Sequence, residues 1–246
     1  MRLLFFSICS LLFLTGFRPD NQEASLIRQG EDEVKYLYVY APNGLNMRDG
    51  PELSYNKLIK IPYGAKVELI HHAEDQSLVV DGLTGGMAKL SYGGYTGYAF
   101  EGYLNKYRAP EKNMEARKYV DKLRSDGHLV YYEKTERDYD GYFQFEEAII
   151  LHECEWEDAF LVAKQLFRIP PKLYFPPTSN KSEDKFENPD KAEYAWSDEM
   201  SAKRVEGIIA EISYYYRGEG SGHSVTIKPD KDNPEAFRIT DLGIAD

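Results

Sequence analysis

The sequence predicts a mainly β protein in two parts, a small β-barrel followed by an α+β domain built on an antiparallel sheet. In the first part, residues 34–107, short segments that alternate apolar and polar residues are separated by Gly and Pro turns, as in small barrels. In the second part, residues 128–246, longer alternating segments flank a segment whose apolar residues have helical spacing. A linking helix is expected within residues 108–127.

The barrel prediction starts from residues 45–51, Leu-Asn-Met-Arg-Asp-Gly-Pro. The first four residues alternate apolar and polar, as in a strand with one buried face. Gly50 and Pro51 then end the strand, because Gly adopts backbone angles that other residues resist and Pro lacks a ladder donor. Further turns are expected at residues 62–64 and at residues 93–94, where two alternating segments flank a hairpin signal.

This pattern resembles the bacterial SH3 (SH3b) family. The residues that carry the resemblance, in chain order, are Leu45 to Pro51, Tyr55, Pro62, Gly64, Gly94 to Ala99, Tyr103 and Leu104. The chain departs from the family pattern in three places. Met87 stands where a Trp is usual before the late strand, Tyr98 replaces the Trp of the Thr-Gly-Trp motif, and the loop from His71 to Gly86 is longer.

The resemblance implies a binding role, in which a peptide or glycan-peptide lies across an aromatic groove and polar loop groups fix its register. The candidate ligand-binding residues are the barrel tyrosines and the polar residues of the first motif: Tyr55, Tyr63, Tyr95, Tyr98, Tyr103, Asn46, Arg48 and Asp49. The alternative is that the motif serves the fold alone, with Asn46 and Arg48 bonded to loop backbone. The partner implied is a cell-wall peptide or an envelope protein.

The N-terminus has the pattern of a secretory signal peptide. Met1-Arg2 is a short basic start, and residues 3–17 are almost wholly apolar but too short for a membrane helix, which needs about 20 residues. We therefore expect a signal peptide at residues 1–17 and a flexible lead-in at residues 18–33. Export to the periplasm or cell envelope follows, with no membrane span after cleavage; an uncleaved anchor is the alternative.

The net charge limits the kinds of partner that are expected, and the cysteine content limits the disulfides. The net charge of −11 disfavours nucleic acid, whose readers are usually basic, and also disfavours adhesion to anionic lipid. Of the two cysteines, Cys9 lies in the predicted signal peptide. Cys154 alone remains after cleavage, so no internal disulfide is expected.

The second part begins with the linking helix and two strands. Strands are expected at residues 129–132 and 142–151, on either side of a turn at residues 138–141. The apolar face of the linking helix is expected to consist of Ala116, Tyr119, Val120 and Leu123.

A second helix is expected after Glu155, ended by Pro170-Pro171, with acidic residues in its first turn. Its apolar stripe is expected to consist of Trp156, Phe160, Ala163 and Phe167.

The remaining residues are predicted as loops and strands. Residues 176–191 are polar and contain Pro, which indicates a long surface loop, and Ser197 is expected to cap a helical turn through Ala202. Residues 205–217 fit helical spacing in part, but Gly207 and the following β-branched and aromatic residues favour a strand. A turn at Gly218–Gly222 is followed by strands at His223–Lys228 and Ala236–Leu242.

The rival function is a cell-wall hydrolase with its catalytic site in the second part. A thiol peptidase would use Cys154 at a helix start, but Glu153 and Glu155 oppose a thiolate. A zinc site would use His152 and Cys154 on one strand face, without a third ligand in view. The carboxylates are too numerous to single out a glycosidase pair. We therefore predict no catalytic residue, no metal site and no cofactor.

Overall fold

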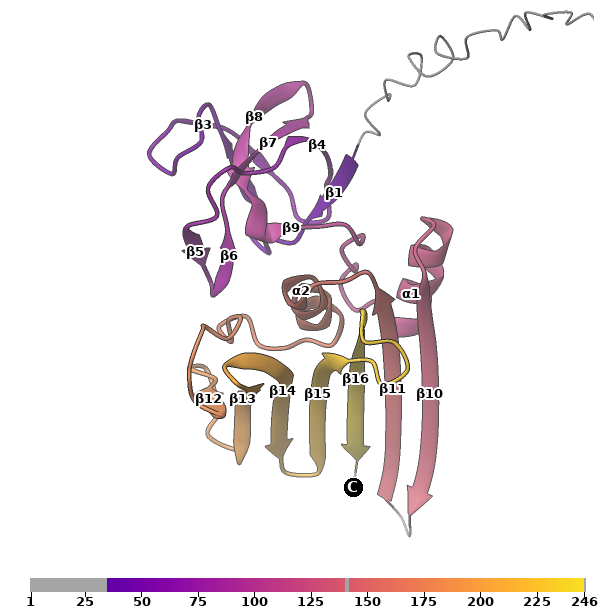
Figure 1. Ribbon diagram of the computed structural model, residues 1–246. Coiled ribbons are helices and arrows are strands. Elements are labelled where there is room, and N and C mark those ends of the chain that lie inside the picture. The colour runs from indigo at the N-terminus through magenta and orange to yellow at the C-terminus, as the bar shows by residue number, and fades with distance from the viewer. Residues whose placement is uncertain (1–34, 140–141, 246) are drawn as a thin grey trace, which may run out of the picture. The chain divides into compact units, whose positions relative to one another are not determined.

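The computed structural model describes residues 35–139 and 142–245, so the predicted signal peptide and lead-in lie outside the described residues. The described residues form two seven-stranded sheets, a separate two-stranded hairpin and two α-helices (Figure 1). All strand pairs are antiparallel. The predicted fold class, a small barrel followed by an α+β part on an antiparallel sheet, is confirmed.

The first sheet has the strand order β3-β2-β8-β7-β4-β1-β9 and corresponds to the predicted barrel. A 3₁₀ turn, η1 (Glu101–Tyr103), leads into its last strand. Its strands are β1 (Lys35–Val39), β2 (Leu45–Arg48), β3 (Lys57–Ile61), β4 (Lys66–His71), β7 (Met87–Tyr92), β8 (Tyr95–Phe100) and β9 (Leu104–Asn105).

Strand β2 shows why the first motif folds as predicted. Leu45 and Met47 are buried while Asn46 and Arg48 stay partly exposed, so the alternation marks one core face. Gly50 is required for a different reason, since a Cβ there would lie 2.2 Å from the ring of Tyr55. The ring of Tyr55 therefore packs directly over the Gly50 backbone. Residues 93–94 connect β7 to β8 with positive φ angles, which confirms the hairpin signal.

The long loop at residues 71–86 contains a hairpin of its own, β5 (Leu78–Val80) and β6 (Leu83–Gly85). Asp81 and Gly82 form its turn with φ angles of 53° and 79°, the left-handed pair that two-residue hairpins favour. The hairpin reaches the second part of the chain, because the Phe175 amide donates to the Asp81 carbonyl at 3.1 Å. The long loop, one of the three departures from the family pattern, thus contains a hairpin that contacts the second part of the chain.

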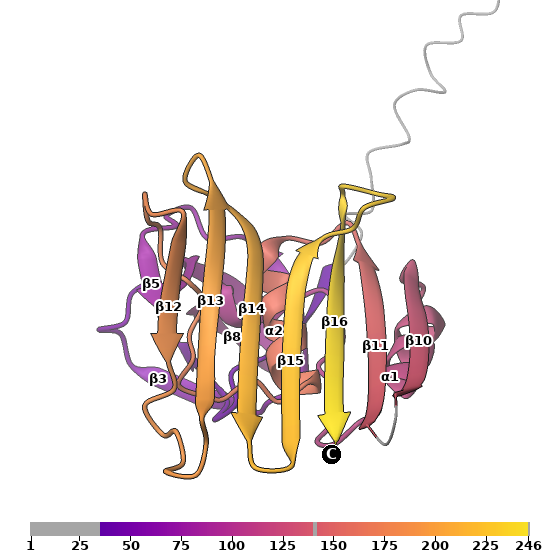
Figure 2. The same ribbon diagram turned by 90° about the horizontal axis from the view of Figure 1, so that it is seen from below.

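The second sheet is a nearly sequential meander with the order β10-β11-β16-β15-β14-β13-β12, and Figure 2 shows its strands side by side. The turn expected at residues 138–141 is shorter than predicted, and residues 140–141 lie outside the described residues. Its strands are β10 (Val130–Tyr139), β11 (Tyr142–His152), β12 (Glu183–Glu187), β13 (Ser197–Val205), β14 (Ile208–Gly218), β15 (Ser221–Pro229) and β16 (Ala236–Ala245).

Two sequence predictions are wrong in this sheet. Ser197 does not cap a helical turn, because residues 197–205 form β13, which pairs with β14 along its length. Every second residue of β13 is buried, among them Asp198 and Met200. This two-residue period belongs to a strand and not to a helix. The predicted surface loop at residues 176–191 likewise contains strand β12, which forms the edge of the sheet.

Helix α1 (Ala116–Ser125) packs against β10 and β11 and buries all four residues of its predicted face. It begins at Ala116, later than the bounds of the linking segment suggest.

Helix α2 (Trp156–Leu166) starts with the predicted acidic turn, in which Glu155 and Asp158 form a reciprocal capping box. It packs against β15 and β16. Of the predicted stripe, Phe160, Ala163 and Phe167 are buried and Trp156 is only partly buried, while Leu161 and Val162 are buried as well. The barrel contacts the start of this helix, because the buried Asn105 side chain donates to the Asp158 carbonyl at 3.1 Å. Neither described helix has the length and apolar composition needed to cross a bilayer.

Candidate functional site

A groove of about 780 Å³ lies on the barrel, and we call it the loop groove. One wall is the turn after β2, residues 51–54, and the other is the first half of the inserted loop, residues 71–78. Strands β7 and β8 supply Met87, Lys89 and Tyr98 between these walls. Its volume falls within the range of about 300–1,000 Å³ that is usual for ligand sites.

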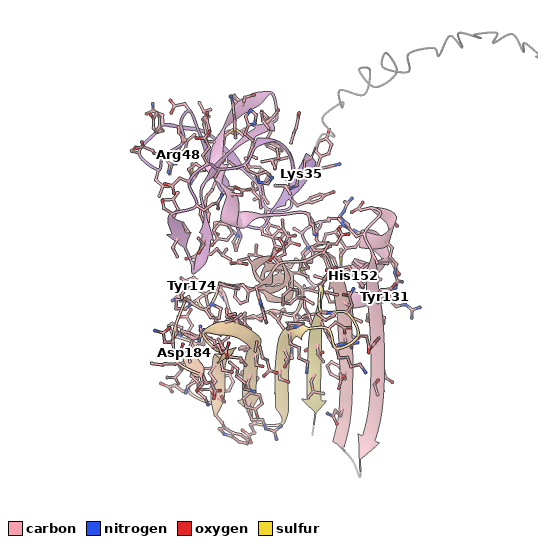
Figure 3. The ribbon with its side chains drawn as sticks, in the orientation of Figure 1. Lys35, Arg48, Tyr131, His152, Tyr174 and Asp184 are labelled. Carbon is pink, nitrogen blue, oxygen red and sulfur yellow. The ribbon has the colours of Figure 1, made fainter. Side chains whose placement is uncertain are left out.

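The first wall is held by the polar residues of the first motif. The guanidinium of Arg48, labelled in Figure 3, donates to the Tyr55 carbonyl at 2.7 Å. The Asn56 amide side chain donates to Asp49 at 3.0 Å, and the Asp49 backbone amide donates to the Asn56 carbonyl at 3.1 Å. These contacts favour the alternative reading of the motif, in which Arg48 and Asp49 shape the loop.

The second wall is held by Glu101 from the 3₁₀ turn. This carboxylate accepts hydrogen bonds from the Ala73 amide at 3.0 Å and from Gln76 at 3.2 Å, and it pairs with His72. Burial alone would raise the pKa of Glu101, but these hydrogen bonds outweigh it and lower the pKa. The wall is therefore anchored by an ionised carboxylate that the strand pattern did not reveal.

The structure separates the five candidate tyrosines. Tyr98 lines the loop groove and sits opposite Arg48 in the β2–β8 pairing. Tyr55 and Tyr95 are exposed but do not line this groove. The Tyr63 hydroxyl instead donates to the Pro110 carbonyl at 2.8 Å, and the Tyr103 hydroxyl donates to Asp81 in the inserted hairpin.

Burial raises the pKa values of both Tyr63 and Tyr103, and both rings pack against the core. Asn46 is partly exposed on β2, opposite Lys60 on β3. The predicted residues thus spread over several faces of the barrel, and the groove gathers Tyr98 with loop residues that the sequence did not single out. Glu74 is one of these, and the unusual length of the loop was its signal, whereas Lys89 comes from strand β7.

Comparison with known families addresses this part of the chain directly. Residues 43–105 match the family model of the bacterial SH3 domain. This region is a bacterial SH3 domain. The match runs from just before β2 to the end of β9, so both walls of the loop groove belong to the SH3 domain. Comparisons with curated proteins and with solved structures gave no match.

The candidate thiol and zinc residues of the second part do not form a joint site. Strand β11 ends at His152, and Glu153 has a φ of 54°, so Cys154 does not continue the alternation as expected. Cys154 is buried, and burial raises its thiol pKa well above the ordinary value. Within residues 35–139 and 142–245, no three His, Cys, Asp or Glu side chains come together as a possible metal site.

The two histidines of the second sheet lie far apart. His152 pairs across the ladder with Ala236, and His223 pairs with Gly243, so roughly 20 Å of strand β16 separates them. In Figure 3, His152 lies beside Tyr131, and the two rings are 5.4 Å apart. His223 instead lies 2.5 Å from the carboxylate of Asp241, a pair that sequence reasoning missed because strand register creates it.

Proposed function

We propose that this chain is an exported, non-catalytic envelope protein whose SH3 domain holds a peptide, from the cell wall or from an envelope protein, in the loop groove. The observation that carries the proposal is the groove itself, with Tyr98 between two loop walls inside the matched SH3 region. A groove lined by aromatic rings is one of the recurring surfaces on which extended peptides dock.

The charges of the groove suggest which end of a peptide it holds. Glu52, Glu74 and Asp75 line it, against the single ammonium of Lys89. Two further lining residues, His71 and His72, add positive charge only when protonated, and His72 is already paired with Glu101. A ligand with a free amino group is therefore favoured over one with a carboxylate at this position.

The test is binding of the full chain to purified peptidoglycan and to soluble amine-bearing peptides derived from it. Glu74→Lys reverses a charge on the groove wall at an exposed residue, so the fold is expected to survive. We expect binding to weaken by roughly tenfold, as for the loss of one charge contact with a partner. Glu235→Lys makes the same reversal at an exposed loop residue outside the groove and is expected to change binding little.

A second pair of variants tests the aromatic floor. Tyr98→Ala removes the ring that lines the groove, and Tyr95→Ala removes an exposed ring from the same strand outside it. Only the first is expected to reduce binding. Equal binding by both variants and the parent protein would remove the loop groove as the site.

A further inference from the structure

A second cavity shares none of the lining residues of the loop groove. Its volume is about 700 Å³. It is lined by Pro42 and by three further segments: residues 63–64 of the SH3 domain, residues 108–113, and the end of α2 with the turn after it, residues 164–171. We call it the basic cavity.

The cavity is positively charged in a protein whose net charge is −11. Its charged lining residues are Arg108, Lys112, Lys164 and Arg168, against the single acid Glu111. Two of these five are already neutralised, because Arg108 pairs with Asp126 at 2.8 Å and Glu111 pairs with Lys122.

The remaining three cations have no ion pair among the described residues. Lys112 and Arg168 are exposed at the rim, where solvent screens their charge. Lys164 is only partly exposed, so its charge is screened less. This leaves three cations among the lining residues of one cavity, with no carboxylate of the described residues in an ion pair with any of them.

Lys164 is held in position by the backbone. Its ammonium donates to the Pro171 carbonyl at 3.0 Å and to the Leu173 carbonyl at 2.7 Å. An ammonium group has three donors, so one remains for a further acceptor. Burial lowers the pKa of Lys164 to about 8, and the nearby Asp81 only partly offsets this.

Apolar surface lies beside these charges. The ring of Tyr63, fixed by its hydrogen bond to Pro110, lines the cavity together with Ile169 and Pro171. A site that combines an apolar wall with a few convergent charged groups is the usual form of a small-molecule site.

We propose that the basic cavity binds a small organic anion, with its carboxylate or phosphate group among Lys112, Lys164 and Arg168 and its apolar part against Tyr63. The three cations supply charge-assisted donors, which are the stronger class of hydrogen bond. The site is separate from the loop groove and does not depend on the function proposed for it.

The test is calorimetric titration of the full chain with three probes of similar size. Phenyl phosphate and benzoate carry the two candidate anionic groups, and benzyl alcohol is the neutral control. We expect both anions to bind and the alcohol to bind at least tenfold more weakly, because it lacks the charge that the cations attract. The anion that binds with the higher affinity identifies whether the cavity prefers a phosphate or a carboxylate group.

A matched pair of arginine variants locates the binding. Arg168→Gln removes a cation from the cavity, and Arg117→Gln removes an exposed cation from α1 outside it. Arg168→Gln is expected to weaken anion binding roughly tenfold, whereas Arg117→Gln and the groove variant Glu74→Lys leave it unchanged. Equal weakening by the two arginine variants, or no binding of either anion, would overturn the proposal.

A second readout does not depend on substitution. An anion beside Lys164 favours its charged form, so the pKa of this lysine, followed by NMR, is expected to rise from about 8 when phenyl phosphate is added. An unchanged Lys164 pKa at saturating ligand would also contradict the proposal.

Discussion

The two seven-stranded sheets are both antiparallel, but they differ in the length of their strands and in how much of the chain lies in loops. The SH3 sheet has strands of two to six residues, interrupted by loops that form the walls of the loop groove. The second sheet has strands of five to eleven residues in a nearly sequential meander. Short strands leave much of the chain in loops that can shape a groove, whereas long strands give a stable platform. Helix α2 and the inserted hairpin both contact residues of the other part of the chain.

The largest effect is expected from Phe160→Ala in α2. Phe160 is buried, and its ring lies 5.4 Å from that of Phe175 in an edge-to-face contact. Truncation leaves a cavity and is expected to lower the free energy of unfolding by about 4 kcal/mol. Urea unfolding measures this, with Tyr194→Ala, 70% exposed, as the aromatic control.

The same experiment tests whether the two sheets unfold together. Trp156 and Trp196 both lie outside the SH3 domain, so their fluorescence follows the second part, while amide NMR signals follow the first sheet. Because α2 is contacted by both, we expect the two unfolding curves of Phe160→Ala to shift together. If only the unfolding curve followed by tryptophan fluorescence shifts, the two sheets unfold independently of each other.

The next effect concerns the hairpin, through a matched pair of glycines. Gly82 has a φ of 79°, and a Cβ there would lie 1.9 Å from the Phe175 carbonyl oxygen. Gly94 has a φ of 82° and no atom within 4 Å of such a Cβ. Replacement by Ala is expected to cost about 3 kcal/mol at Gly82, from clash and strain, but only about 1 kcal/mol at Gly94, from strain alone. Equal losses in thermal unfolding would mean that the hairpin contact adds nothing.

The smallest effect is a pH dependence at the start of α2. Burial raises the pKa of Asp158 from 3.8 to about 6. The folded state therefore holds this proton more tightly than the unfolded state. The contribution of the protonated Asp158 to the free energy of unfolding is complete below pH 3.8 and is lost as the pH rises through about 6. The expected loss is about 1 kcal/mol, because the carboxyl is only partly shielded from solvent.

Asp158→Asn removes the titration but keeps an oxygen acceptor for the Glu155 amide. Its stability relative to the parent protein is expected to increase between pH 4 and pH 6, in urea unfolding at a series of pH values. Asp232→Asn, at an exposed loop residue, is the control. A stability difference that stays constant with pH would contradict the assignment.

The sequence predicted the elements whose evidence is local. Alternation at Leu45–Arg48, the hairpin signal at residues 93–94 and the helical spacing from Ala116 to Leu123 each depend on neighbouring residues, and each was confirmed. Strand β13 was missed because Ser197 and Asp198 also suit a helix cap, and only pairing with β14 decides between the two. In the loop at residues 71–86, Asp81-Gly82 is a two-residue turn signal, but the flanking strands of three residues are too short to show a clear alternating pattern.

The candidate sites were less predictable because they combine residues from segments that are distant in the sequence. Tyr98 was named from the family pattern, but its groove neighbours Glu74 and Lys89 come from other segments. In the basic cavity, Tyr63 and Lys164 are about a hundred positions apart in the chain. No spacing rule connects such residues, because their proximity arises from tertiary packing alone.

The inserted loop also determines how a mechanical load would travel. Its first half is a wall of the groove, and its tip is joined to Phe175 by a backbone hydrogen bond. A pull on the groove would therefore reach the loop that contains Phe175 through the hairpin, in addition to the covalent chain after β9 and the hydrogen bond from Asn105 to Asp158.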